Sequence, residues 1–591
     1  MPLDPDRACL CPTGPSRACD AILCLKTASP EFPLHVSRQQ DEIEVESRPE
    51  VRRFMTSRAR RAIFSLVLFF SVCALVGSLL QGKVGAQSAA DESQFRDNIK
   101  QFTSVYALVE QNYAEPLTGD KADGAIYDGA IPSMLHVLDP HSNFYDPKAY
   151  AKMREDQQGR YYGVGMLIQQ QKDKIYVVTP YEGTPSFKAG IHPGDIIASV
   201  DGKSTDGMNS EAVSKLLKGP KGTPVTITTI RDGQAKPLSF QLVRDEIPHP
   251  SVDLQFQIHP GVGYIHLANF SSETAGREVD DAVDGFGNMK GLILDLRGNP
   301  GGLLSQAVEI CDHLLTRGQI IVSQRGRAYP DQVYTVTHGN GGKTFPIVVL
   351  VNRNTASAAE IVSGALQDHD RALIAGETTF GKGLVQTVYN LSDNTGLALT
   401  TYHYYTPSGR LIQRDYTGIS LYDYYYNHAN ALPADSTNRE VKLTDSGRNV
   451  YGGGGITPDV KIDTPKSNHF TDELLGHDVF FHYAPHYVAA HPVANDFQVN
   501  DAVLADFKQY LTGEKISWNE QDFAANLDWV KTNIKSKIVT IQFGQLQGLR
   551  VEADWDPMIQ KAITYLPQAL ALEQSAHKSE QQKAEARMPT R

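Results

Sequence analysis

Short apolar segments alternate with helical segments between Val262 and Val388, and this alternation constrains the fold more than any other feature of the chain. The strand candidates are Gly263 to Leu267, Gly291 to Leu296 and Ile347 to Val351. Apolar strands that alternate with helices indicate an α/β core. Ligands collect at the carboxyl ends of the strands in such sheets, so the loops that follow these segments are candidate site loops.

Other parts of the 591-residue chain show different sequence patterns. At about 150 residues per domain, a chain of this length is expected to contain three or four domains. Helical periodicity covers residues 94 to 117 and 125 to 138, and short β-like runs separated by glycines begin near Tyr161. We therefore predict a helical region over 91–157, a β-rich module over 158–244, the α/β core over 245–465 and a mainly helical extension over 466–591, frayed from about 575.

The N-terminal segment has the layout of an export signal. Ala62 to Leu80 is an uncharged apolar run of 19 residues that follows three arginines and precedes small residues. The run is also long enough to cross a bilayer. Residues 55–90 are therefore expected to be a cleaved signal or a retained inner-membrane anchor, with the body in the periplasm or cell envelope. Met55 precedes this pattern, so residues 1–54 are expected to be a non-native or disordered leader.

Charge and cysteine content exclude other classes. The net charge of −12 argues against a general nucleic-acid binder, which needs a concentrated basic surface. Cys311 is the one cysteine of the predicted mature body, so no internal disulfide framework is expected.

Three loops carry the candidate chemistry. The first, Asn352 to Glu360 (NRNTASAAE), places Ser357 on a strand-to-helix turn, where backbone amides can stabilise an oxyanion. The same segment also fits the sequence pattern of a helix capping box, which has no catalytic role.

The second loop, Gly376 to Gln386 (GETTFGKGLVQ), places Lys382 between two glycines. A lysine acts as a general base when it is neutral, and burial lowers its pKa in that direction. Gln386, four residues later, could hold the amine by a hydrogen bond. A solvated lysine in a turn is the alternative.

The third loop, Leu294 to Leu304 (LDLRGNPGGLL), ends an apolar strand with Gly301 and Gly302, whose amides would face the sheet edge. Asp295 and Arg297 are expected to fix this loop. An ordinary glycine-rich loop without a binding role would have the same sequence pattern.

Taken in order, these loops resemble those of the C-terminal processing peptidases, also called tail-specific proteases. The similarity extends from about Phe102 to Ile462, and further motifs carry it: LDPHS at 138–142, YGVGM at 162–166, AGIHPGDII at 189–197, YYTPSGR at 404–410 and GITPD at 455–459. The resemblance implies a multidomain α/β protein in which a PDZ domain is inserted beside a crotonase/ClpP-like protease core.

The resemblance also implies roles. Ser357 would be the nucleophile, Lys382 the general base and Gln386 the residue that positions it, with an oxyanion hole from the amides of Ala358 and of Gly301 or Gly302. The implied activity is that of a serine endopeptidase that cleaves proteins near their C-termini without metal or organic cofactor. His141, in the LDPHS turn, is an alternative base that we interpret as a structural turn residue.

The PDZ domain would take the substrate's extended C-terminus as an added strand. The loop Gly163, Val164, Gly165 and Met166 is predicted to hold the free, apolar C-terminal residue and its carboxylate. The expected partners are thus polypeptides with free C-termini and not nucleic acid. An adaptor or activating ligand, a homo-oligomer and membrane attachment through an uncleaved N-terminal segment are further expectations.

Two departures from the family pattern stand out. Residues 414–454 intervene before the GITPD motif, and the segment after Pro465 is longer than a minimal member needs. We expect both to form partner or regulatory surfaces and no part of the catalytic site. Competing interpretations are a non-catalytic PDZ peptide-binding scaffold in the cell envelope and a crotonase-like enzyme acting on a small molecule. The complete set Ser357, Lys382 and Gln386 argues against the first, and the PDZ-like module against the second.

Overall fold

The computed structural model describes residues 93–426 and 439–587, with side chains to 579. The chain divides into two compact units, Met1–Pro116 and Leu117–Arg591. In the first unit residues 93–112 form a helix whose apolar side chains, Phe102 and Val105 among them, are largely exposed. The leader and the apolar run at Ala62–Leu80 lie outside the described residues, within which no helix is long and apolar enough to span a bilayer.

The core of the second unit is a six-stranded sheet, confirming the predicted α/β core. Its strand order is β10-β11-β12-β15-β16-β21, and every pair is parallel except β10 with β11. The strands are β10 (Val252–His259), β11 (Val262–Leu267), β12 (Gly291–Asp295), β15 (Ile347–Val351), β16 (Ala372–Gly376) and β21 (Val460–Lys461). The three predicted strand segments thus correspond to β11, β12 and β15.

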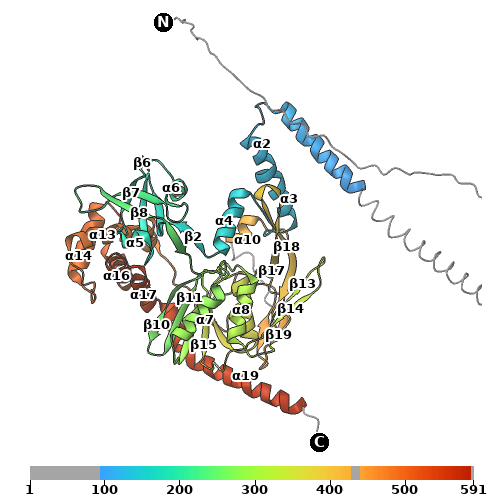
Figure 1. Cartoon of the computed structure of the whole chain (residues 1–591). Coiled ribbons are helices and arrows are strands. Elements are labelled where there is room, and N and C mark those ends of the chain that lie inside the picture. Colours follow the sequence, from blue (N-terminus) through green and yellow to red (C-terminus); the bar gives the residue numbers. More distant parts are fainter. Residues whose placement is uncertain (1–92, 427–438, 588–591) are drawn as a thin grey trace, which may run out of the picture. The chain divides into compact units, whose positions relative to one another are not determined.

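Both faces of this sheet are covered by helices, which explains why β12 and β15 are apolar at nearly every position. Leu292, Leu294 and Val349 pack on one face against α7, α8 and α9. Ile293 and Val348 pack on the other face against α18 and α19. The helices are α7 (Ala275–Gly285), α8 (Leu304–Leu314), α9 (Ala358–Asp368), α18 (Pro557–Thr564) and α19 (Leu566–Arg587). Figure 1 shows α19 running beneath the sheet.

A second, antiparallel sheet stands beside the core. Its order is β1-β18-β13-β14, with β17 also paired to β18. The strands are β1 (Asn143–Tyr145), β13 (Ile320–Arg325), β14 (Gln332–Thr335), β17 (Leu384–Asn390) and β18 (Gly396–Tyr405). The helical segments α2 (Asp120–Gly124), the π-helix η1 (Ala125–Ala130) and α3 (Ile131–Leu138) precede β1, and α4 (Pro147–Gln157) follows it.

The predicted β-rich module is a separate sheet of order β3-β4-β5-β7-β8, joined to the core through the pair β2 and β9. Strand β3 lies at the open edge of this sheet, beside α6. The elements are β2 (Arg160–Gly163), β3 (Met166–Gln171), β4 (Lys174–Pro180), α5 (Pro185–Lys188), β5 (Ile196–Val200), β6 (Lys203–Ser204), α6 (Ser210–Leu217), β7 (Pro224–Ile230), β8 (Leu238–Val243) and β9 (Asp245–Pro248).

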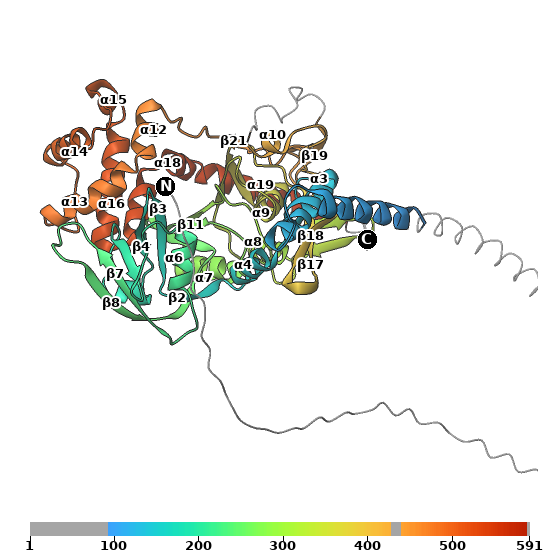
Figure 2. The ribbon, with the colours of Figure 1, turned by 90° about the horizontal axis from the view of Figure 1, so that it is seen from above.

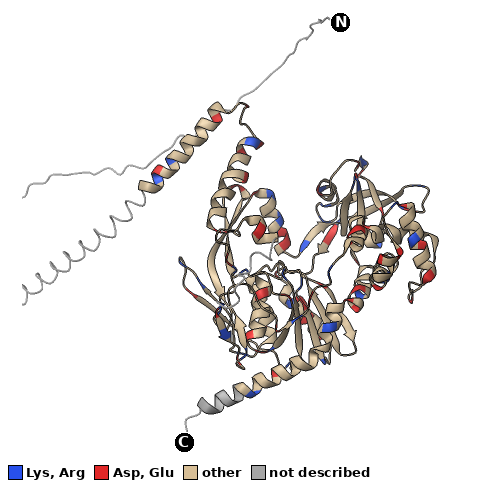
Figure 3. Ribbon diagram, turned by 180° about the vertical axis from the view of Figure 1, so that it is seen from behind, with Lys and Arg blue, Asp and Glu red and all other residues tan. Residues whose placement is uncertain are grey.

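The C-terminal extension is helical, as predicted. Phe480, Phe507 and Phe523 centre a cluster that joins its first helices. These helices lie beside the β-rich module (Figure 2), where Gln171 Nε2 donates to Asp478 Oδ2 at 2.8 Å. The helices are α12 (His469–Gly476), α13 (Val479–Ala490), α14 (Asp501–Gly513), α15 (Glu520–Ala525), α16 (Leu527–Phe543) and α17 (Gln545–Trp555). Lysine and arginine are interspersed with acidic residues along these elements (Figure 3).

Candidate functional site

Ser357 stands at the turn between β15 and α9 and is the N-cap residue of α9. Its backbone dihedrals are φ 56° and ψ −117°, a region that non-glycine residues rarely adopt. Such strain persists where surrounding contacts enforce it, and it is typical of functional turns. The turn presents the Ser357 hydroxyl at the amino end of a helix, as the sequence predicted.

Lys382 lies in the loop between β16 and β17, with Gly381 and Gly383 on either side. Gly381 has φ 87°, and a Cβ there would lie 2.9 Å from the Gly455 nitrogen and from the Arg414 side chain. The glycines are therefore required because other chain segments approach the loop closely.

Glu360, on the first turn of α9, joins these two loops. Its fully buried carboxylate accepts hydrogen bonds from the backbone amides of Ser357 (2.9 Å) and Lys382 (2.9 Å). It also accepts from the Gly381 amide (2.8 Å) and the Thr379 hydroxyl (2.5 Å). Burial raises the pKa of the Glu360 carboxyl, and these four donors oppose that effect. The predicted capping interaction between Glu360 and Ser357 therefore exists, as one part of a network that also holds the lysine loop.

Ser357 and Lys382 line one cavity of about 660 Å³. Ile361, Leu384 and Tyr404 contribute to its wall. Burial lowers the pKa of the Lys382 amine, while Glu360 and Asp139 act in the opposite direction. Within the described part of the chain, neither an ion pair nor a hydrogen bond engages the Lys382 amine. The structure thus places an amine whose pKa is lowered by burial and a hydroxyl at the same cavity.

Gln386 lines the same cavity on β17, but its amide donates to Thr400 Oγ1 at 3.1 Å. The predicted hydrogen bond from Gln386 to the Lys382 amine does not occur among the described residues. A register shift between Val385 and Gln386 in the β17–β18 pair accompanies this orientation. The four-residue spacing from a loop lysine could not reveal that irregularity.

The glycine loop lies directly against Ser357. A Cβ on Gly301 would be 2.7 Å from the Ser357 Cβ and 2.8 Å from the Ala358 nitrogen. The Gly301 amide donates to Asn299 Oδ1 at 2.8 Å. For the amides of Gly302 and Ala358, the described residues supply no acceptor. Sequence left the choice between the two glycines open, and the hydrogen bonding favours Gly302 as the free donor.

Asp295 and Arg297 fix the glycine loop, as predicted. The buried Asp295 carboxylate accepts from Arg297 Nε at 2.9 Å and from the Tyr264 hydroxyl at 2.9 Å. Arg297 Nη1 also pairs with Asp556 Oδ2 at 2.9 Å. Asp556 caps α18, so the C-terminal extension supports a loop beside Ser357. The expectation that this extension forms only partner or regulatory surface was therefore incomplete, because two of its helices cover the core sheet.

His141 occupies the predicted turn, in which Asp139 Oδ1 accepts from the His141 and Ser142 amides. The structure also places His141 on the wall of the cavity that holds Ser357 and Lys382. Burial, aided by the charge of Lys382, lowers the His141 pKa to about 3, so the ring is neutral near pH 7. Sequence reasoning missed this position because the turn lies far from the three loops along the chain.

The loop from Gly163 to Met166 precedes the edge strand β3. Its carbonyls are engaged, since Ser186 N donates to Val164 O and Tyr181 N donates to Gly165 O. For the Val164 and Gly165 amides no acceptor occurs among residues 93–426 and 439–587. These amides are therefore available to an anion beside an open strand edge.

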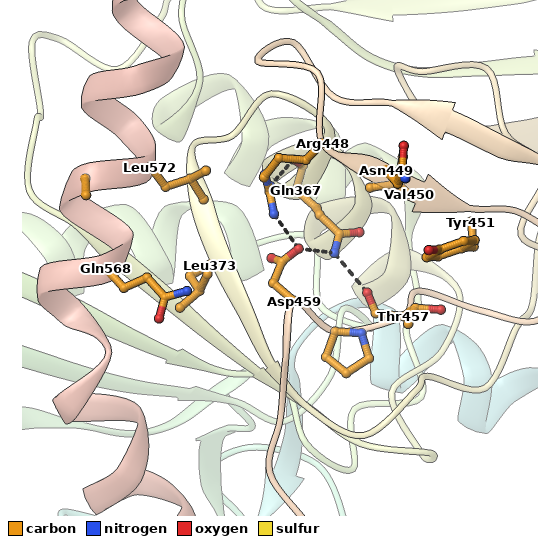
Figure 4. Close-up of a pocket in the computed structure, with 12 residues that line it drawn as sticks. Gln367, Leu373, Arg448, Asn449, Val450, Tyr451, Thr457, Asp459, Gln568 and Leu572 are labelled. Atoms are coloured by element: carbon orange, nitrogen blue, oxygen red, sulfur yellow. Dashed lines mark hydrogen bonds and ion pairs between the residues drawn. The ribbon is translucent and has the colours of Figure 1, made fainter.

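Another cavity, of about 600 Å³, lies between α19 and the core (Figure 4). Its charged side chains are Arg448 and Asp459, which pair with each other at 2.6 Å, and Arg448 also pairs with Asp370 at 2.7 Å. Because this guanidinium is already neutralised, we assign it a structural role.

Comparisons with known proteins give one consistent result. The family models that match are "Peptidase family S41" at residues 261–420, "PDZ domain" at 163–242 and "Probable PDZ-protease, C-terminal helical domain" at 470–521. The chain is 37% identical over 354 residues to the carboxy-terminal-processing protease of Bartonella bacilliformis, covering 59% of this chain and 80% of that protein. It is 32% identical over 403 residues to the carboxy-terminal processing protease CtpA of Bacillus subtilis, covering 66% and 82%. A solved photosystem II D1 C-terminal processing protease is 30% identical, with a TM-score of 0.31 over 61% of this chain and 92% of that one.

The Glu360 network gives a testable prediction. In Glu360→Gln the side-chain NH2 group would face backbone and hydroxyl groups that are themselves hydrogen-bond donors. A buried donor without an acceptor costs about 1–3 kcal/mol. We expect the free energy of unfolding to fall by about 2 kcal/mol and peptide hydrolysis to fall roughly 10- to 100-fold, because both loops lose their anchor. Chemical denaturation and initial-rate assays measure these effects. Glu473→Gln, on the surface of the helical domain, is the control, and equal behaviour of the two variants would contradict the role of Glu360.

Proposed function

The chain belongs to peptidase family S41, among the carboxy-terminal processing proteases, and as a serine peptidase with a PDZ domain it acts on polypeptides; on this premise we propose that Ser357 is its nucleophile and Lys382 its general base. The shared cavity of the two residues is the observation that carries the proposal. The protease relatives argue against both the scaffold and the small-molecule enzyme.

The proposed reaction begins when the neutral Lys382 amine takes the proton from the Ser357 hydroxyl. Ser357 Oγ then attacks the carbonyl carbon of the scissile peptide bond. The amides of Gly302 and Ala358 donate to the oxyanion that forms. Protonated Lys382 gives its proton to the leaving amine, and a water activated by Lys382 later hydrolyses the acyl-enzyme. Hydrogen bonds of this kind often form only when substrate is bound, which is consistent with the lack of a Ser357–Lys382 hydrogen bond among the described residues.

In the proposed reaction Gln386 has a supporting role and takes no part in proton transfer. Its amide lies on the cavity wall and is held by Thr400, so it can orient substrate or the lysine only after a change of partner. The roles of adaptor, membrane attachment and homo-oligomer stay predictions.

The Ser/Lys assignment predicts a specific pH dependence. Protonated Lys382 cannot accept a proton, so kcat/KM should rise with pH through the lysine pKa, and burial places that pKa below the usual 10.5. Ser357→Ala and Lys382→Ala should abolish cleavage of an unfolded reporter that ends in an apolar residue. The His141→Gln variant should keep the same rise of kcat/KM with pH, even if the value of kcat/KM changes, because the pKa of His141 is about 3. Cleavage that survives in both alanine variants would place the catalytic residues elsewhere.

For the PDZ domain we propose that the Val164 and Gly165 amides bind the substrate's terminal carboxylate, while the substrate chain pairs with β3. Amidating that carboxylate removes a charged acceptor, and hydrogen bonds to charged groups are worth about 1.5–3 kcal/mol. KM should therefore rise roughly tenfold or more with a small change in kcat. Steady-state kinetics on matched free and amidated substrates measure this. Identical KM values would show that the carboxylate is not recognised.

We further propose that the protein is exported, because the arginine-flanked run from Ala62 to Leu80 has the layout of a signal or anchor. Fractionation of a bacterial host should find the full chain in the periplasm or inner membrane and a variant starting at Ala90 in the cytoplasm. Cytoplasmic recovery of both forms would contradict export.

A further inference from the structure

A second cavity, of about 930 Å³, also reaches Lys382. His141 and Pro300 line both this cavity and the one that holds Ser357. Ser357 itself is not among the described residues that line the second cavity. Lys382 therefore stands at the junction of two spaces, one of which contains the nucleophile.

One wall of the second cavity comes from the sequence insertion at 414–454. Helix α10 (Leu421–Tyr426) contributes Leu421, Tyr422, Tyr425 and Tyr426 to the lining. We expected this insertion to form a partner or regulatory surface and no part of the catalytic site. None of its described residues lines the cavity of Ser357, but α10 lines the second cavity beside Lys382 through long-range contacts that no local sequence pattern reveals.

Tyr424 anchors this helix beside the catalytic loops. Its side chain is buried, and its hydroxyl lies 2.9 Å from His141 Nε2. Its ring packs edge-on against Phe380, at 5.4 Å between centroids. The Tyr425 hydroxyl donates to the Pro140 carbonyl at 2.6 Å. Helix α10 is thus fixed to the histidine turn and to the lysine loop.

The cavity presents an aromatic and uncharged surface next to the base. Tyr422 is 70% exposed and Tyr426 is 75% exposed, with their rings 5.4 Å apart. None of the described residues lining the cavity is a carboxylate or an arginine. Exposed aromatic rings around a cavity are typical of a surface that binds apolar or aromatic groups.

The chemistry of Lys382 decides which part of a substrate reaches this surface. The general base that deprotonates Ser357 must then protonate the leaving amine, so the leaving segment lies on the lysine's side of the nucleophile. The second cavity is lined by Lys382, whereas Ser357 lines only the first of the two cavities among the described residues. It is therefore placed to receive residues on the C-terminal side of the scissile bond.

We propose that this cavity, here called the tyrosine subsite, binds a large apolar or aromatic side chain of the fragment that leaves from the C-terminal side of the scissile bond. The proposal rests on the assignment of Ser357 and Lys382 made above. It makes Tyr422 and Tyr425 specificity-determining residues and gives the insertion a role in substrate selection.

Kinetics on matched peptides test the tyrosine subsite. The peptides differ only in carrying Phe, Leu or Ala at the first or second position after the scissile bond, and mass spectrometry confirms the cleavage point. In the full-length enzyme kcat/KM for Phe should exceed that for Ala by about tenfold, a usual discrimination for an apolar pocket. Tyr422→Ala should bring the ratio towards one, and Tyr422→Phe, which keeps the ring, should preserve it.

Two controls separate the subsite from the chemistry. Tyr329→Ala removes an exposed tyrosine that lines neither cavity, and it should retain the Phe preference. A substrate whose scissile bond is a methyl thioester has no C-terminal fragment, so Tyr422→Ala should hydrolyse it at the parent rate.

The outcomes are distinct. A Phe preference that falls in Tyr422→Ala, with thioester hydrolysis unchanged, supports the tyrosine subsite. An equal Phe to Ala ratio in the parent and in Tyr422→Ala overturns the subsite and leaves the Ser/Lys assignment intact. Hydrolysis of neither peptide nor thioester by the parent overturns the Ser/Lys assignment, and the subsite with it.

Discussion

The buried carboxylate of Glu360 holds the catalytic region together. A carboxylate offers about four acceptor positions, and four donors from two different loops occupy this one. Ser357 keeps an unfavourable backbone conformation because its amide is tied to that carboxylate. The same group acts on Lys382, since its charge raises the lysine pKa while burial lowers it. One side chain thus fixes the backbone at Ser357 and opposes the effect of burial on the Lys382 pKa.

The three loops converge because their strands are neighbours in a parallel sheet. Strands β12, β15 and β16 lie side by side, and the glycine loop, Ser357 and Lys382 each follow one of them. Carboxyl ends of parallel strands meet at one edge, so residues distant in sequence come together there. This is why apolar segments followed by glycine-rich or serine-containing loops predicted the α/β core and marked Ser357, Lys382 and the glycine loop as candidates, whereas the roles of Ser357 and Lys382 came from the family resemblance.

Other features were beyond sequence reasoning because they depend on contacts between distant segments. The spacing of Gln386 from Lys382 suggested a shared face, but the β17–β18 irregularity turns the glutamine amide towards Thr400. The choice of Gly302 required knowing that Asn299 already accepts from Gly301. His141 and the tyrosines of α10 reach the site by packing on each other and on Phe380. Aromatic clusters of this kind carry no periodic signal along the chain.

The C-terminal extension shows that sequence modules and folding units differ. The match to the peptidase model ends at residue 420, yet one face of the core sheet is buried by α17, α18 and α19, far beyond that point. Asp556, which caps α18, also pairs with Arg297 of the glycine loop. The helices before it contact the PDZ domain through Asp478 and Gln171. A sheet buried on both faces needs both layers of helices, so the extension belongs to the protease core as well as to the surface beside the PDZ domain.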